Sequence, residues 1–208
     1  MILLGRDLSP FVRRTATALN LLGLQYERRT LNTNDDAEEL RRYNPLGRVP
    51  ALLVDDAVII DSAAILDYAL ELADAEHRLL PASGVPRRNT LHVSAIATGT
   101  MEKGVASAYE VANRPKELVY QPYREKLQQQ ARAGLLALEE LAPQEGWFGG
   151  DQPNLADVNA VVAYDFVGIV APQVAESITG LLMKLSQRAN ALEAFASTRW
   201  NGGSPFPK

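Results

Sequence analysis

Residues 44–68 read NPLGRVPALLVDDAVIIDSAAILDY, and this stretch is the strongest indicator of fold in the chain. Two short apolar runs, VPALLV and AVII, are separated by Asp55 and Asp56, which is the pattern of two strands joined by a tight hairpin turn. Asp61 and Ser62 then open a segment whose apolar residues recur near helical spacing. The sequence therefore predicts an antiparallel β-hairpin followed by a covering helix.

The residues before this stretch add further strands and helices. Ser9-Pro10 is typical of a helix start, with serine as the N-cap and proline at the first helical position. We expect a strand over residues 2–5, a helix over 11–22, a strand over 26–31 and a short charged helix over 35–43. The expected order is β-α-β-α-β-β-α. Because its first part is a βαβ unit, the first two strands should be parallel.

The second half of the chain has a different character. Residues 77–86 hold two prolines and a glycine with few large apolar side chains, so we interpret them as a linker. We expect helices over residues 87–111, 117–141, 158–170, 173–187 and 189–197, and an irregular tail over 201–208. Asn154 followed by Asp157 has the spacing of a capping box before the third of these helices. The predicted domains are an α/β domain over residues 1–76 and an all-helical domain over 87–208.

Composition argues against several classes of protein. A net charge of −4 and a pI near 5.3 do not suit a nucleic-acid-binding protein, whose binding surface is usually basic. The chain has no cysteine, which excludes disulfides, thiolate metal sites, a cysteine nucleophile and a C-x-x-C disulfide reductase. With only His77 and His92 and no calcium-loop pattern, we expect no metal.

Membrane insertion and export are not expected either. No apolar stretch approaches the ~18 residues that a membrane-spanning helix needs. The apolar run at the N-terminus is too short for a signal peptide. We therefore expect a cytoplasmic protein without a membrane partner.

The motifs in residues 44–68 resemble the glutathione-binding half of the soluble glutathione transferases. The resemblance rests on the NPLGRVP segment and on the DSAAILDY segment that follows the hairpin. Ser9-Pro10-Phe11 is similar to the position of the activating residue in this family, here of the serine type, and residues 154–157 resemble the capping motif of its helical domain. The resemblance covers nearly the whole chain. It implies a thioredoxin-like N-terminal domain and an all-helical C-terminal domain.

The resemblance also implies a glutathione site. In the family, the proline of Val49-Pro50 is cis, and the Val49 backbone would pair with glutathione as an added strand. Ser62 at the helix start would bind the γ-glutamyl carboxylate, Asp61 (often glutamate in the family) the ammonium, and Arg48 the glycyl carboxylate. Local sequence leaves other interpretations open: a trans proline on an edge strand, plain N-capping, and an exposed basic side chain.

Ser9 is the candidate catalytic residue. An unperturbed thiol with a pKa of about 8.5 is only about 3% ionised at pH 7, yet the thiolate is the nucleophile. A hydroxyl that donates to the sulfur contributes roughly 1.5–3 kcal/mol, or about one to two pKa units. The alternative is that Ser9 only caps the helix. Tyr26 and Tyr43 do not lie near that helix start, so a tyrosine-type enzyme is less favoured, and without cysteine a cysteine-type enzyme is excluded.

The pocket for the electrophile is harder to find in the sequence. By resemblance it would lie between the N-terminal domain and the first long helix of the second domain. The candidates are Phe11, Met101, Val105 and Tyr109. Packing in the core is the commoner role for each of these residues, and residue type does not separate the two roles because such clefts are mostly apolar.

The function implied by the resemblance is conjugation of the glutathione thiolate to small apolar electrophiles. This is a detoxification reaction with glutathione as co-substrate and no metal, carried out by a homodimer. Reduction of hydroperoxides and isomerisation are related uses of the same thiolate. The alternative from another class is a non-catalytic binding or regulatory protein of the same fold.

Overall fold

The computed structural model describes residues 1–202, and the contacts within it divide the chain into two compact units. The first unit contains Met1–Ala82 together with Leu192–Trp200, and the second is built on Ser83–Ala191. Residues 203–208, which belong to the tail predicted to be irregular, lie outside the described residues. The chain therefore returns to its first unit near the C-terminus, within the range that the sequence predicted as one helical domain.

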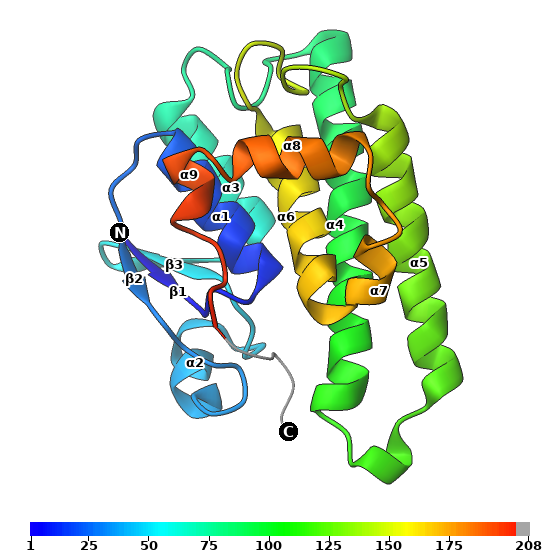
Figure 1. The fold of residues 1–208 in the computed structure, drawn as a ribbon. Coiled ribbons are helices and arrows are strands. Elements are labelled where there is room, and N and C mark those ends of the chain that lie inside the picture. The colour runs from blue at the N-terminus through cyan, green and yellow to red at the C-terminus, as the bar shows by residue number, and fades with distance from the viewer. Residues whose placement is uncertain (203–208) are drawn as a thin grey trace. The chain divides into compact units, whose positions relative to one another are not determined.

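The first unit has the predicted β-α-β-α-β-β-α order (Figure 1). Its elements are β1 (Ile2–Leu4), α1 (Pro10–Leu21), β2 (Glu27–Arg29), α2 (Ala37–Tyr43), β3 (Ala51–Val54), β4 (Ala57–Ile60), α3 (Ser62–Ala73) and, from the C-terminal segment, α9 (Glu193–Ala196). The strands follow the order β2-β1-β3-β4 in the sheet. Strands β1 and β2 are parallel, whereas β3 is antiparallel to both β1 and β4. The predicted thioredoxin-like fold and its hairpin are confirmed.

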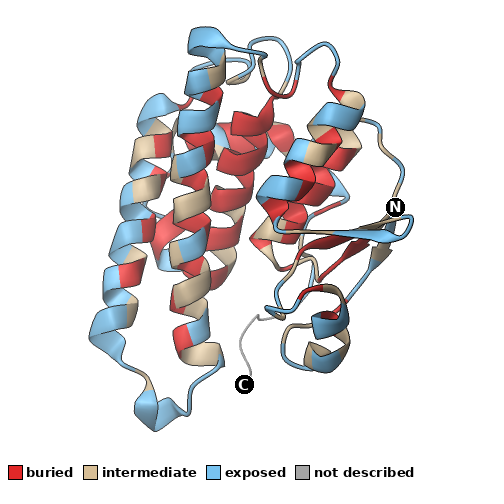
Figure 2. Cartoon of the chain, turned by 180° about the vertical axis from the view of Figure 1, so that it is seen from behind, coloured by how far each residue is buried: buried red, intermediate tan, exposed pale blue. Residues whose placement is uncertain are grey.

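Helices cover both faces of the sheet. Alternate residues of a strand point to opposite faces, so each strand contributes side chains to the packing on both. On one face, Leu3 and Leu52 share a buried cluster with side chains of α1 and α3. On the other face, Leu4 and Ala51 pack with Leu40 of α2. Figure 2 shows buried residues on the strands and on the helices that cover them. The strand ends, and the loops attached to them, are thus held by packing on both sides.

Helix α9 is fixed to α1 by side-chain hydrogen bonds. The hydroxyls of Thr17 and Thr198, both buried, lie 2.9 Å apart. Asn20 donates from Nδ2 to the carbonyl of Ala194 at 3.1 Å and to Oγ of Ser197 at 3.2 Å. These partners are far apart in the sequence, so local periodicity gave no indication of this contact.

The regular elements in the described residues of the second unit are all helices, as predicted, apart from an isolated β-bridge between Trp147 and Gly150. Its elements are α4 (Gly84–Ala112), a short 3₁₀ turn (Lys116–Leu118), α5 (Gln121–Leu141), α6 (Leu155–Val170), α7 (Pro172–Ala175) and α8 (Leu181–Ala189). Helix α4 packs against both α5 and α6. Within the described part of the chain, none of the helices combines the length and the apolar character needed to cross a membrane.

The capping box predicted before α6 is confirmed. The Asn154 side chain accepts the N–H of Ala156 at 2.8 Å, and the carboxylate of Asp157 accepts the backbone N–H of Asn154 at 2.8 Å. Asp157 is fully buried and also accepts the N–H groups of Phe148 at 2.9 Å and Gly149 at 3.3 Å. One carboxylate therefore fixes both the start of α6 and the loop that leads into it.

The prediction of one helix over residues 173–187 is wrong. The chain forms α7 and α8 with a break between them. Glu139 of α5 accepts the N–H of Leu181 at 2.6 Å and the N–H of Leu182 at 2.8 Å. These bonds satisfy two of the unpaired N–H groups at the start of a helix, so α8 begins at Leu181 as a separate helix. The helix predicted over 189–197 and the strand predicted over 26–31 are also shorter in the structure, at Glu193–Ala196 and Glu27–Arg29.

The stability of the protein should depend on the ionisation of Asp157. Burial raises the pKa of Asp157 to about 6 from its usual 3.8, although the backbone N–H groups of Asn154, Phe148 and Gly149 favour the carboxylate. A group whose pKa is higher in the folded state stabilises that state most when it is protonated. The contribution of Asp157 to the free energy of unfolding is therefore complete below about pH 4 and is lost as the pH rises through about 6. We expect a loss on the order of 2–3 kcal/mol between these limits.

The matched reference is Asp157→Asn, which does not titrate. Urea unfolding at pH 4, 5, 6 and 7 should show the free energy of unfolding of the wild type falling relative to that of the variant. A difference between the two proteins that stays constant across this range would contradict the prediction.

Candidate functional site

Three segments that carry predicted site residues meet at one end of the sheet. Leu4 at the end of β1 pairs with Ala51 at the start of β3, and Ala51 pairs with Ile60 at the end of β4. The loop after β1, the residues before β3 and the residues after β4 therefore emerge at the same end of the sheet (Figure 1). In chain order, these segments contain Ser9, Val49-Pro50 and Asp61-Ser62.

Ser9 is the N-cap of α1. Its backbone is extended, with φ −64° and ψ 121°, and its hydroxyl oxygen accepts the N–H of Val12 at 3.4 Å. The side chain is partly buried, and within residues 1–202 its hydroxyl proton has no acceptor. A hydroxyl carries one proton and two lone pairs. Ser9 therefore caps the helix and still has a donor to offer a ligand.

The loop before β3 is organised by Asn44, which is buried. Its Nδ2 donates to the carbonyl of Arg48 at 2.8 Å, and its Oδ1 accepts the N–H of Leu46 at 3.0 Å. The carbonyl of Asn44 accepts the N–H of Gly47 at 2.8 Å, and Gly47 has φ +62°, which glycine adopts readily. The Arg48 side chain is exposed and makes no ion pair with any residue that the structure describes. Its charge is available to an anion.

Val49 follows this loop and precedes a cis peptide bond. The bond between Val49 and Pro50 is cis, as predicted. Val49 packs against apolar side chains on both faces of the sheet. Across the described residues, neither its N–H nor its C=O has a hydrogen-bond partner. An N–H and a C=O free on one residue at the end of a sheet are the groups to which an extended peptide binds.

The start of α3 provides a second set of polar groups. Asp61 has φ 72° and ψ 136°, an uncommon conformation for a residue other than glycine, and its Oδ1 accepts the N–H of Ala63 at 2.8 Å. Ser62, the first residue of the helix, is buried. Its hydroxyl has no partner in the described part of the chain. Because Asp61 supplies the cap, the Ser62 hydroxyl and the positive helix end remain available to an anion.

The predicted electrophile residues differ in exposure. Phe11 lies in the first turn of α1 and is partly buried. On α4, Met101 is fully buried, Val105 is partly buried and Tyr109 is exposed. That these four side chains form a pocket stays a prediction.

Sequence reasoning assigned no structural role at this sheet end to Asn44 or Gly5, although Asn44 belongs to the NPLGRVP motif. Asn44 carries a local signal, because asparagine between a helix and a proline commonly bonds to nearby backbone. Gly5 has φ +134°, and a Cβ placed on it would lie 2.5 Å from Cγ2 of Val12 and 3.0 Å from Cβ of Val49. These neighbours come from other parts of the chain, so the need for glycine there is visible only in the structure.

Family comparisons match both halves of the chain. The family described as "Glutathione S-transferase, N-terminal domain" matches residues 3–77, and the family described as "Glutathione S-transferase, C-terminal domain" matches residues 106–193. Among solved structures, a glutathione S-transferase from Methylobacterium radiotolerans in complex with glutathione sulfonate has the same fold. It aligns with a TM-score of 0.87 and 23% identity over 100% of this chain and 95% of that one.

Two sequence relatives are more similar in identity. Maleylacetoacetate isomerase from Pseudomonas aeruginosa is 33% identical over 157 residues, which are 71% of this chain and 72% of the relative. A glutathione S-transferase from Triticum aestivum is 30% identical over 163 residues, which are 76% of this chain and 73% of the relative. On these matches and on its fold, the chain belongs to the glutathione S-transferase family.

Proposed function

We propose that this chain binds glutathione at the sheet end described above and activates its thiol for attack on a small apolar electrophile. One observation carries the proposal. Three segments present hydrogen-bonding groups that no described residue uses: the hydroxyl proton of Ser9, the N–H and C=O of Val49, and the hydroxyl of Ser62. The structural relative from Methylobacterium radiotolerans, crystallised with glutathione sulfonate, supports the same ligand class.

The charges at this end of the sheet complement those of glutathione, which has two carboxylates and one ammonium. The Val49 backbone would pair with the peptide as an added strand. The start of α3, with Ser62, would bind the γ-glutamyl carboxylate, and Asp61 would bind the ammonium beside it. Arg48 would pair with the glycyl carboxylate, bidentately where the geometry allows. Every charge of the ligand then has an opposite charge or a helix end to face.

Ser9 would activate the thiol by donating its free proton to the sulfur. This hydrogen bond stabilises the thiolate relative to the thiol, and the N-terminus of α1 acts in the same direction. The thiol proton leaves to solvent. The thiolate then forms a carbon–sulfur bond with the electrophile, either by displacing a leaving group as an anion or by adding to a conjugated double bond whose electron pair takes up a proton from solvent. Phe11, Met101, Val105 and Tyr109 are the residues that we propose to contact the electrophile.

Isomerisation is a second candidate, because one relative is named maleylacetoacetate isomerase. An isomerase returns its glutathione unchanged after each turnover, whereas a transferase consumes one glutathione for each product. Measuring free thiol during turnover of maleylacetoacetate and of a standard aromatic electrophile therefore separates the two. Glutathione binding without turnover of either compound would instead favour the non-catalytic alternative. The homodimer stays a prediction from the family, and the cytoplasmic location stays a prediction from the sequence.

Ser9→Ala should separate thiol activation from binding. We expect the Kd for glutathione to change by less than about threefold, because the other contacts remain. The pKa of the bound thiol should rise by about one to two units toward its unperturbed value, and conjugation at pH 7 should slow by about 8- to 25-fold as the thiolate fraction falls. Calorimetry gives the affinity, and thiolate absorbance against pH gives the pKa.

Ser9→Thr is the matched control, because it keeps a hydroxyl at the N-cap. It should retain most of the thiol pKa shift, while Ser9→Ala loses it. If the bound thiol ionises at the same pH in all three proteins, Ser9 acts only as a cap. If the wild type binds no glutathione at millimolar concentration, the proposed function itself is wrong.

Asp61→Gly should weaken glutathione binding with little change in stability. Glycine tolerates the φ of 72° found at this position, which offsets the loss of the Asp61 cap on Ala63, so the free energy of unfolding should change by less than about 1 kcal/mol. Loss of the ammonium contact should raise the Kd by at least about tenfold. Thermal unfolding and calorimetry measure the two effects.

Asp55→Gly is the control for this variant. Asp55 also has a positive φ, of 49°, but lies in the turn of the β3–β4 hairpin at the opposite end of the sheet. The same substitution there should leave the affinity for glutathione unchanged. Equal affinities for all three proteins would remove Asp61 from the proposed site.

A further inference from the structure

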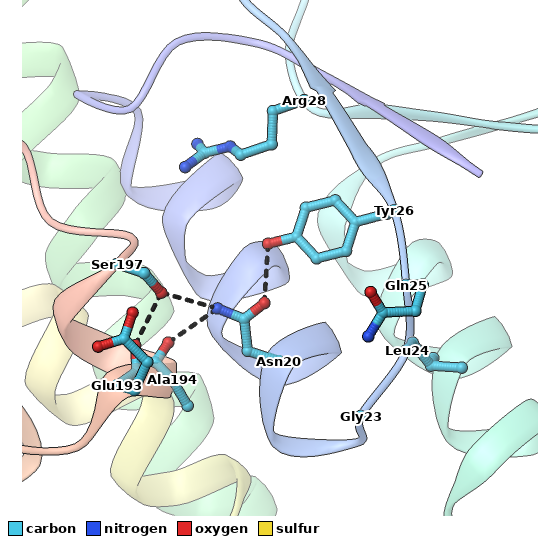
Figure 3. Close-up of a pocket in the computed structure, with 9 residues that line it drawn as sticks. All are labelled: Asn20, Gly23, Leu24, Gln25, Tyr26, Arg28, Glu193, Ala194 and Ser197. Carbon is cyan, nitrogen blue, oxygen red and sulfur yellow. Dashed lines mark hydrogen bonds between the residues drawn. The ribbon is translucent and has the colours of Figure 1, made fainter.

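A pocket of about 470 Å³ lies in the first unit, away from the residues assigned to glutathione (Figure 3). Its walls come from the C-terminal end of α1, the residues leading into β2, and α9. None of Ser9, Arg48, Val49, Asp61 and Ser62 lines it. The pocket therefore needs an explanation of its own.

The side chain of Asn20 connects the walls of the pocket. Its Nδ2 donates to the Ala194 carbonyl at 3.1 Å and to Oγ of Ser197 at 3.2 Å, and its Oδ1 accepts the hydroxyl of Tyr26 at 3.0 Å (Figure 3). Asn20 thus joins α1, α9 and the residues before β2. A pocket whose walls are already held together loses little entropy when a ligand enters.

The unpaired charge in the pocket is negative. Arg28 lines it, but its guanidinium is paired with the carboxylate of Asp7. Glu193 is exposed, and neither its carboxylate nor the carboxamide of Gln25 has a partner in the part of the chain that the structure describes. An anion would meet a guanidinium that is already neutralised and a free carboxylate that repels it. A cation would meet the free carboxylate of Glu193.

The pocket also offers apolar surface. The ring of Tyr26 and the side chain of Leu24 are both partly buried and line it, and the Tyr26 ring lies between Arg28 and Gln25 (Figure 3). An aromatic face attracts a nearby cation as well as apolar carbon. A ligand that suits this lining has a positively charged nitrogen joined to an apolar body.

We propose that this pocket binds a small organic amine. Its ammonium would donate to Glu193, and its apolar part would lie on the ring of Tyr26. The site is independent of the proposed glutathione site, so its failure would leave that function untouched.

The test uses phenethylamine as the probe and 3-phenylpropanoate as its counterpart of opposite charge. Titration of the ¹⁵N-labelled full chain with phenethylamine should shift the amide signals of residues 24–28 and 193–197, with a Kd of about 1 mM or below. The carboxylate should bind at least about tenfold more weakly. No shift of these signals at about 10 mM amine, or equal binding of both compounds, would overturn the proposal.

The decisive variant is Glu193→Gln, which keeps the size of the side chain and removes the charge. It should weaken phenethylamine binding by at least about tenfold. Glu27→Gln is the matched control, because Glu27 is an exposed glutamate on β2 that does not line the pocket. That variant should bind as the wild type does. An unchanged affinity in Glu193→Gln, or an equal loss in both variants, would show that Glu193 does not recognise the amine. Retention of the wild-type amide spectrum establishes that each variant is folded.

Discussion

The close packing of Gly5 against Val12 and Val49 is the constraint on which the candidate site depends. Any Cβ at Gly5 would meet Val12 at 2.5 Å and Val49 at 3.0 Å, and the φ of +134° is itself unfavourable for other residues. Glycine therefore lets the end of β1, the first turn of α1 and the residue before Pro50 come together. Ser9 lies on the same loop, between Gly5 and α1, so this packing fixes where its hydroxyl sits relative to the Val49 backbone.

Helices α1 and α3 both begin at this end of the sheet, and they differ in which side chain caps the helix and which group is left for a ligand. At α1, Ser9 is both the cap and the free donor, because only its oxygen is used by Val12. At α3, Asp61 supplies the cap, and the hydroxyl of Ser62 is left without a partner among the described residues. Glutathione carries a thiolate when activated and a carboxylate at its γ-glutamyl end. In the proposed complex, each of these anions faces the positive end of a different helix.

The sequence predicted what is encoded locally. The Asp55-Asp56 turn, the Ser9-Pro10 helix start and the Asn154–Asp157 capping box each depend on residues within a few positions of one another, and each is present in the structure. The motif of residues 44–68 likewise contains the loop and the helix start of the candidate site. Contacts between distant residues escaped prediction: the cap of α8 by Glu139, and the bonds from Asn20 and Thr17 that return α9 to the first unit. The periodicity of one segment predicts its own secondary structure, but it does not predict which distant segment it contacts.

The absence of cysteine limits the chemistry of the proposed site to the sulfur of its ligand. Ser9 would stabilise the thiolate without forming a bond to it, so the fate of that sulfur depends on the electrophile. When the thiolate displaces a leaving group from carbon, the new carbon–sulfur bond is stable, and the result is conjugation. Addition to a conjugated double bond is reversible; the thiolate can leave again after rotation about that bond, and the result is isomerisation. In the proposed complex, both reactions would use Ser9, Val49 and Ser62 in the same way. The choice between them would then depend on the residues around the electrophile.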